Sequence, residues 1–147
     1  MKKELKQGHD YIGVGGGVLI FNKKGEVLLK KRSKNSRNEI GYWEKPGGAI
    51  EFGEKAGKAM KREVKEEVNL GIKIWGLLPH TDHIVDGQHW MALNYLADAS
   101  SEEKMKNMEP DKADELGWFS LEKLPKKIAQ PTRESIKNYL AKKFINL

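Results

Sequence analysis

The chain has 147 residues, of which 38% are hydrophobic and 33% charged, with a formal net charge of +6 and no cysteine. This length predicts one domain, residues 1–147. The sequence has no run of about 18 apolar residues, so no membrane span is predicted. The missing cysteines exclude disulfides and thiolate metal sites and fit a cytoplasmic protein. The basic charge would attract polyanions, but no zinc-finger spacing or Lys/Arg block with aromatics predicts nucleic-acid binding.

The first predicted elements form a hairpin. Residues 11–20 are rich in Tyr, Ile, Val and Leu and predict a strand, Asn22–Gly25 is a turn signal, and residues 26–30 predict the second arm. A short strand is expected at 41–43. The four glycines of the first strand precede no Gly-Lys-Ser/Thr and no helix, so they predict close backbone approach rather than a phosphate loop.

The rest of the chain alternates strands and helices. A helix is predicted over 54–68 and an amphipathic helix near the C-terminus, where Ile136, Leu140 and Phe144 recur at helical spacing. Further strands are predicted at 72–78, 90–96 and 117–119, with a charged loop over 102–113. This mixture predicts an α+β fold in which a mixed β-sheet packs against α-helices.

The helix predicted over 54–68 has three faces at about 100° per residue. Apolar residues form one stripe, lysines face water, and the third face carries Glu63, Glu66 and Glu67. Like charges at this spacing destabilise a bare helix by roughly a few tenths of a kcal/mol per pair. A divalent cation would remove that repulsion, and all-oxygen ligands suit Mg²⁺ or Mn²⁺. On composition alone, a solvated glutamate patch is the stronger alternative.

The spacing of these residues favours a metal site over a solvated glutamate patch. The pattern Gly48-x5-Glu54-x7-Arg62-Glu63-Val64-x-Glu66-Glu67-x-Asn69-Leu70 resembles the signature box of the Nudix hydrolases, Gly-x5-Glu-x7-Arg-Glu-U-x-Glu-Glu-x-Gly-U, where U is aliphatic. The box therefore covers residues 48–70. Its one departure is Asn69 in place of the late glycine. Asparagine tolerates the left-handed conformation that ends a helix, so the departure does not affect the glutamates.

The resemblance extends to about residues 11–125. Trp43–Gly48 resembles the family's approach to the box, and later motifs resemble the small MutT-type nucleoside triphosphate pyrophosphatases: His89-Trp90, Glu109–Lys112, Gly117–Phe119 and Leu124-Pro125. The resemblance implies a Nudix fold, with a mixed sheet between helices. It also implies a metal-dependent pyrophosphohydrolase, in which water attacks phosphorus with Mg²⁺, or Mn²⁺, as cofactor.

The resemblance also implies roles for the box glutamates. Glu66 and Glu67 would be the main metal ligands, and the carbonyl of Gly47 would be another, since the glycine pair lets the backbone approach closely. Glu63 would be a ligand or the general base, two alternatives that the sequence leaves open. All three glutamates are therefore candidate catalytic residues.

Other residues would support the site. Glu54 and Arg62 are expected to pair with each other or to orient the ligands. Arg32 matches a position where MutT-type members place a basic residue that binds phosphate, with a solvated loop arginine as the alternative. His89 is the best substrate-contact candidate among the histidines. Glu115 could add a late-chain carboxylate to the metal site.

Three functions remain open. The first is hydrolysis of nucleoside triphosphates to monophosphate and pyrophosphate, which the Glu109–Phe119 stretch favours. The second is a Nudix activity on ADP-ribose, nucleotide sugars or dinucleoside polyphosphates. The third is nucleotide or RNA binding without hydrolysis, which the intact glutamates disfavour. The expected partner is a small nucleotide, with no membrane or nucleic acid; the family resemblance is compatible with a homodimer.

Overall fold

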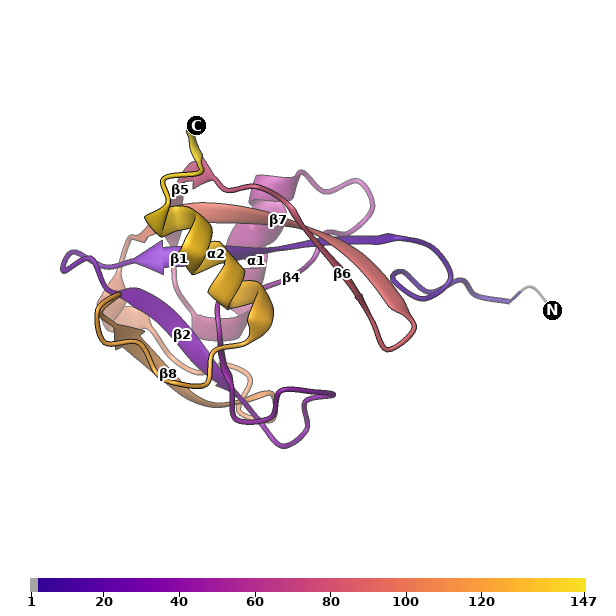
Figure 1. The fold of residues 1–147 in the computed structure, drawn as a ribbon, viewed down its shortest axis with the longest axis horizontal. Coiled ribbons are helices and arrows are strands. Elements are labelled where there is room, and N and C mark those ends of the chain that lie inside the picture. The colour runs from indigo at the N-terminus through magenta and orange to yellow at the C-terminus, as the bar shows by residue number, and fades with distance from the viewer. Residues whose placement is uncertain (1–2) are drawn as a thin grey trace.

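The computed structural model describes residues 3–147, which form one mixed sheet with two α-helices (Figure 1). The helices are α1 (Ala56–Val68) and α2 (Gln130–Leu140), with a short 3-10 helix η1 (Glu102–Lys104). The strands are β1 (Gly13–Phe21), β2 (Val27–Arg32), β3 (Trp43–Glu44), β4 (Gly47–Ala49), β5 (Ile72–Leu77), β6 (Thr81–Val85), β7 (Gln88–Ala99), β8 (Ala113–Phe119) and β9 (Ile145–Asn146).

The centre of the sheet is the parallel pair of β1 and β7, in register from Gly13 opposite Trp90 to Phe21 opposite Asp98. The main strand order is β3-β2-β1-β7-β5-β9, with β8 paired to β2, β6 to β7 and β4 to β1. The short β4 is antiparallel to β1, where Gly47 lies opposite Gly17. This pairing brings the start of the signature box onto the central strand.

The sheet buries both of its faces, because β1 alternates between two apolar clusters. Val18 and Ile20 belong to the cluster that contains α1, whereas Leu19 and Phe21 belong to the cluster that contains α2. The apolar stripe predicted for the box helix is fully buried against the first cluster: Met60, Val64 and Val68. The predicted α+β fold, a mixed sheet between α-helices, is therefore confirmed.

The end of α1 explains the asparagine in the box. Asn69 has φ 55° and ψ 40°, the left-handed conformation, and its backbone N–H donates to the carbonyl of Lys65. Its side-chain amide also donates to the carbonyl of Lys104 at 2.9 Å. Asparagine thus ends the helix where the family pattern has glycine, and its side chain attaches η1 to the end of α1.

The structure contains strands that the sequence patterns do not predict. The β6–β7 hairpin turns at Asp86 and Gly87, both with positive φ, so the Asp-Gly dipeptide is the signal for it. The predicted 90–96 strand is longer, as β7, and the predicted 41–43 strand is β3, displaced because Gly41 lies in a turn. Within residues 3–147, neither α-helix has the length and hydropathy needed to cross a bilayer.

Candidate active site

The three glutamates predicted as metal ligands lie on α1 and differ in solvent exposure. Glu67 is 6% exposed, Glu63 is partly buried, and the Glu66 side chain is 54% exposed. The Glu63 carboxylate lies directly against the backbone of Gly48: a Cβ on that glycine would be 2.4 Å from Glu63 Cδ. A Cβ on Gly47 would meet the carbonyl oxygen of Gly16 at 2.1 Å. A side chain at either glycine would clash with its neighbours, so the glycine pair permits the close backbone approach expected of it.

Arg62 connects the outer carboxylates. Its guanidinium donates to both oxygens of Glu54, at 2.6 and 2.9 Å, and to Glu63 at 3.0 Å and Glu66 at 3.2 Å. It also donates to the carbonyl of Ala49 at 3.2 Å. The hydrogen bond from Arg62 lowers the pKa of Glu54 to about 2. The predicted Glu54–Arg62 pair is present, and it attaches the box loop to α1.

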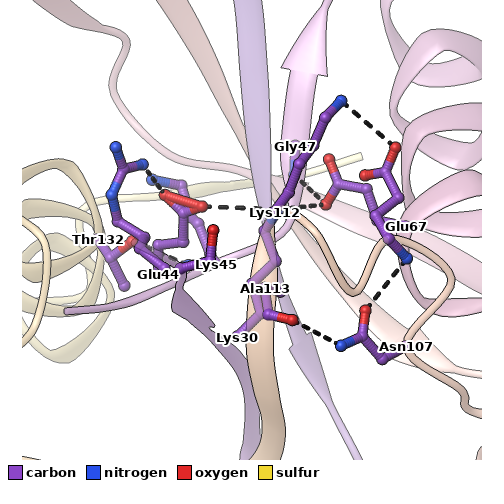
Figure 2. A network of polar contacts seen from close by, with 12 residues as sticks. Lys30, Glu44, Lys45, Gly47, Glu67, Asn107, Lys112, Ala113 and Thr132 are labelled. Atoms are coloured by element: carbon purple, nitrogen blue, oxygen red, sulfur yellow. Dashed lines mark hydrogen bonds and ion pairs between the residues drawn. The ribbon is translucent and has the colours of Figure 1, made fainter. Parts of the chain in front are cut away.

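The inner carboxylate, Glu67, is joined to β3 through Lys30 (Figure 2). Lys30 Nζ lies 3.2 Å from Glu67 and 3.5 Å from Glu44, and the N–H of Gly47 points to Glu67 at 3.4 Å. Burial raises the pKa of Glu67 to about 7 against the opposing effect of Lys30. Burial lowers the pKa of Lys30, but the charges of Glu67 and Glu44 outweigh it and leave that pKa raised.

These residues fit a divalent metal by their chemistry. The donors on α1 are all carboxylate oxygens, which hard cations prefer. Burial, as the largest cause, raises the pKa of Glu63 as well as that of Glu67, although Arg62 acts to lower the first pKa and Lys30 the second. In the side-chain positions of residues 3–147, no three acidic or imidazole groups converge as a metal cluster. Arg62 and Lys30 instead occupy the oxygens that an ion would take.

A late-chain carboxylate does approach α1, but it is Glu109. Burial is the main cause of the raised pKa of Glu63, and the charges of Glu66 and Glu109 add to it. The loop before Glu109 is held on the end of α1, where the Met108 N–H donates to the Glu67 carbonyl at 3.0 Å. Glu115, the late-chain candidate from the sequence, is exposed and lies 3.9 Å from Lys31.

A cavity of about 660 Å³ lies on the α2 side of the sheet. It is lined by β1, β6, β7, the 38–47 segment and the start of α2, and it reaches Glu44 and Gly47, where the Lys30–Glu67 network begins (Figure 2). The cavity and the carboxylates of α1 therefore meet at Gly47. A ligand in the cavity could place one end beside Glu67.

Lys45 is the cation inside this cavity that no sequence pattern indicates. It is 9% exposed, its Nζ donates to the carbonyl of Pro131 at 3.3 Å, and burial lowers its pKa to about 8. Its neighbours in the box approach, Pro46 and Gly47, suggest only a turn. The Lys45 stem packs against Gly17 of β1, and the Thr132 hydroxyl accepts from the Lys45 backbone N–H at 2.9 Å.

The two predicted substrate contacts differ in position. Arg32 lines the cavity, but its guanidinium is held by Glu44 at 2.6 Å and by the backbone and side chain of Asn38. His83, rather than His89, is among the lining residues. Contact of Arg32 or His89 with substrate stays a prediction, which the position of His89 does not favour.

The fold and the sequence are similar to those of known Nudix proteins. A crystal structure of the MutT NUDIX hydrolase from Burkholderia pseudomallei has 35% identity and a TM-score of 0.78, covering 87% of this chain and 98% of that one. A MutT protein from Methanosarcina mazei Go1 has 25% identity and a TM-score of 0.77, covering 89% and 94%. The ADP-ribose pyrophosphatase of Methanocaldococcus jannaschii is 32% identical over 95% of this chain and 80% of its own.

The NUDIX domain family matches residues 12–139. The chain therefore belongs to the Nudix hydrolase family, whose members act on pyrophosphate bonds and generally use divalent metals. The family resemblance predicted from the box is confirmed. Some curated relatives match over shorter segments: a Nudix hydrolase of Listeria innocua is 40% identical over 58 residues, which is 34% of its length.

Proposed function

We propose that this chain hydrolyses nucleoside triphosphates to the monophosphate and pyrophosphate, with Mg²⁺ as cofactor and Mn²⁺ as a substitute. The observation that carries the proposal is the meeting of a roughly nucleoside-sized cavity with a carboxylate helix at Gly47. The similarity to the MutT NUDIX hydrolase of Burkholderia pseudomallei supports the triphosphate class.

In this proposal Glu66 and Glu67 hold the metal, together with the carbonyl of Gly47. The metal supplies positive charge for the phosphate oxygens and for the attacking water. Because Lys30 lies 3.2 Å from Glu67, it keeps a positive charge beside that carboxylate. Glu63, pressed against Gly48, is a further ligand or the general base. Arg62 keeps the outer glutamates in place through its bonds to Glu54 and Ala49.

A second candidate is hydrolysis of ADP-ribose. The relative named ADP-ribose pyrophosphatase in Methanocaldococcus jannaschii aligns with 95% of this chain, a far longer match than the 55 residues shared with an RNA pyrophosphohydrolase. The same carboxylates would serve either substrate, because both contain a pyrophosphate bond. The two activities differ in products and in what fills the cavity. A cytoplasmic location, a homodimer and a single domain over 1–147 stay predictions.

Product analysis tests the proposal. The protein is incubated with Mg²⁺ or Mn²⁺ and each of the common nucleoside triphosphates, 8-oxo-dGTP, ADP-ribose or a dinucleoside polyphosphate, and the products are separated by chromatography. Monophosphate and pyrophosphate from a triphosphate are expected. AMP from ADP-ribose alone would replace the proposal by the second candidate, and no turnover of any compound would refute both.

Two helix variants link the activity to the site. Glu67→Gln should lower kcat by about 100-fold or more, because a buried metal ligand is lost. Lys65→Gln removes a charge from the exposed side of the same helix and should leave kcat unchanged. Equal activity of Glu67→Gln and Lys65→Gln would show that Glu67 is not a metal ligand needed for catalysis.

A further inference from the structure

Lys30 fills the space between two largely buried carboxylates that belong to different elements. Its Nζ lies 3.2 Å from Oε2 of Glu67 on α1 and 3.5 Å from Oε2 of Glu44 on β3 (Figure 2). The Lys30 side chain is 11% exposed, and those of Glu67 and Glu44 are 7% and 22% exposed. The fold therefore holds one positive charge at a fixed point beside the carboxylates of α1.

Glu67 keeps one carboxylate oxygen for a metal. The Gly47 N–H points to Oε2 at 3.4 Å, and this is the same oxygen that faces Lys30. Within residues 3–147, no hydrogen bond or ion pair reaches the other oxygen, Oε1. Oε1 is therefore available to the cation that the proposed function places between Glu66 and Glu67. A second cation at Oε2 would have to share the space of Lys30.

The formal charges around Lys30 cancel one another. Glu44 faces two cations, because its Oε1 accepts from Arg32 at 2.6 Å while its Oε2 faces Lys30. Lys30 in turn faces two anions, Glu44 and Glu67. Two acidic groups and two basic groups thus form one neutral chain of contacts, which leaves no excess charge for a cation to neutralise.

The outer carboxylates of α1 differ, because they have an excess of two negative charges. The single guanidinium of Arg62 donates to three carboxylates: Glu54, Glu63 and Glu66. One positive charge is therefore shared among three negative ones. The remaining excess equals the charge of one divalent cation, and carboxylate oxygens are the ligands that such a cation prefers.

The charged residues that border these groups leave the balance unchanged. Glu109, whose charge acts on Glu63, lies 3.5 Å from Lys112. On the cavity side, Lys45 is acted on by the charge of Glu134 as well as by that of its neighbour in the chain. Each bordering acid thus has a basic partner, and the net formal charge of the site stays at the two units of the outer carboxylates.

We propose that Lys30 limits the nucleotide-free protein to one divalent cation. The ammonium fills the position between Glu67 and Glu44, and a second cation there would lie close to it in a largely buried space, where like charges repel strongly. Lys30 is then a positioning residue that sets the number of metals. Any further cation would arrive with the phosphates of a substrate, which bring their own negative charge. The inference rests on the proposed function for the placement of the first cation.

Mn²⁺ binding to the nucleotide-free protein tests this limit without requiring catalysis. The number of ions bound per chain is measured at pH 8.5, where Glu67 is ionised, from the electron paramagnetic resonance signal of free Mn²⁺. The wild type should bind one Mn²⁺. Two or more ions per chain, or no binding, would overturn the proposal without any variant.

The variant Lys30→Ala then assigns the limit to this ammonium, because it removes the charge and opens its space. It should bind two Mn²⁺, whereas Lys31→Ala should bind one, since it removes the next lysine of β2, whose side chain is 37% exposed. The double variant Lys30→Ala/Glu44→Gln should bind one again, because the second ion loses one of its carboxylates. One ion in Lys30→Ala, or two ions in the double variant, would contradict the assignment.

Lys30→Met provides the same test if Lys30→Ala does not fold, because methionine keeps the unbranched stem. With the charge removed and the space still filled, this variant should bind one Mn²⁺ with a Kd about 10-fold lower than that of the wild type. An unchanged or higher Kd would refute the inference. A protein that binds one Mn²⁺ but hydrolyses no triphosphate keeps this inference and loses the proposed function; one that hydrolyses triphosphates but binds two ions without nucleotide does the reverse.

Discussion

Replacing Lys45 by methionine should stabilise the fold at neutral pH, and the gain should shrink as the pH rises. Burial lowers the pKa of this lysine from 10.5 to about 8. Between these two values the unfolded chain holds a proton that the folded chain has released, so the stability contribution of the group rises with pH. Below pH 8 both states are protonated and the full cost of burying the charge applies.

The magnitude follows from the shift. At roughly 1.4 kcal/mol per pKa unit, the cost is about 3 kcal/mol at pH 7 and about 1 kcal/mol at pH 10. Methionine keeps an unbranched stem over Gly17, but it leaves the Pro131 carbonyl without its donor, a loss of about 1 kcal/mol. The expected net gain is therefore about 2 kcal/mol at pH 7 and near zero at pH 10.

Urea unfolding followed by tryptophan fluorescence measures both values. Wild type and Lys45→Met are compared at pH 7 and pH 10, with Lys126→Met as a control that removes an exposed charge. The control should change the unfolding free energy by no more than about 0.5 kcal/mol at either pH. A Lys45→Met variant that is less stable than wild type at pH 7, or equally stabilised at both pH values, would refute the burial argument.

Four further results are expected. Arg62→Lys should raise the Mg²⁺ concentration for half-maximal activity about 10- to 100-fold, because an ammonium cannot bridge Glu54 and the helix as the guanidinium does; an unchanged Mg²⁺ titration would contradict this. Arg32→Ala should raise KM for triphosphates in steady-state assays, and an unchanged KM would limit Arg32 to holding Glu44 and its loop. Asn69→Ala should lower the unfolding free energy by about 1–2 kcal/mol and Asn69→Gly by less, since φ is 55°; equal losses in urea titrations would exclude backbone strain. Chelation by EDTA should lower Tm in wild type but not in Glu67→Gln, and equal shifts in differential scanning calorimetry would argue against a metal at Glu67.

The signature box made α1 predictable because its constraints are local. Helical periodicity alone separates the buried stripe of Met60, Val64 and Val68 from the glutamate face, and the structure keeps that division. The left-handed end at Asn69 and the Glu54–Arg62 pair also depend on short spacings within the box. Each of these features could be inferred without knowing what packs against the helix.

The cavity end of the site could not be predicted in this way. Lys45 and Asn94 become neighbours through the pairing of β1 with β7, and an ion pair joins Lys30 on β2 to Glu67 on α1. These contacts join residues far apart in sequence, and a single lysine in a strand or turn has no periodic signal. The Asp86-Gly87 hairpin is different, since its dipeptide is a recognisable turn signal even though the strand before it is weakly patterned.

The parallel pairing of β1 with β7 also has a consequence for how the protein is made. The partners Gly13 and Trp90 are separated in the sequence by the whole signature box and by strands β2 to β6. At roughly 5–20 residues per second of synthesis, β1 waits several seconds for its partner to be translated. During that time its apolar segment has no central strand to pair with, so it is the segment we expect chaperones to protect. The cavity, which is lined by Ala92 and Asn94 of β7, can therefore form only after β7 has been translated.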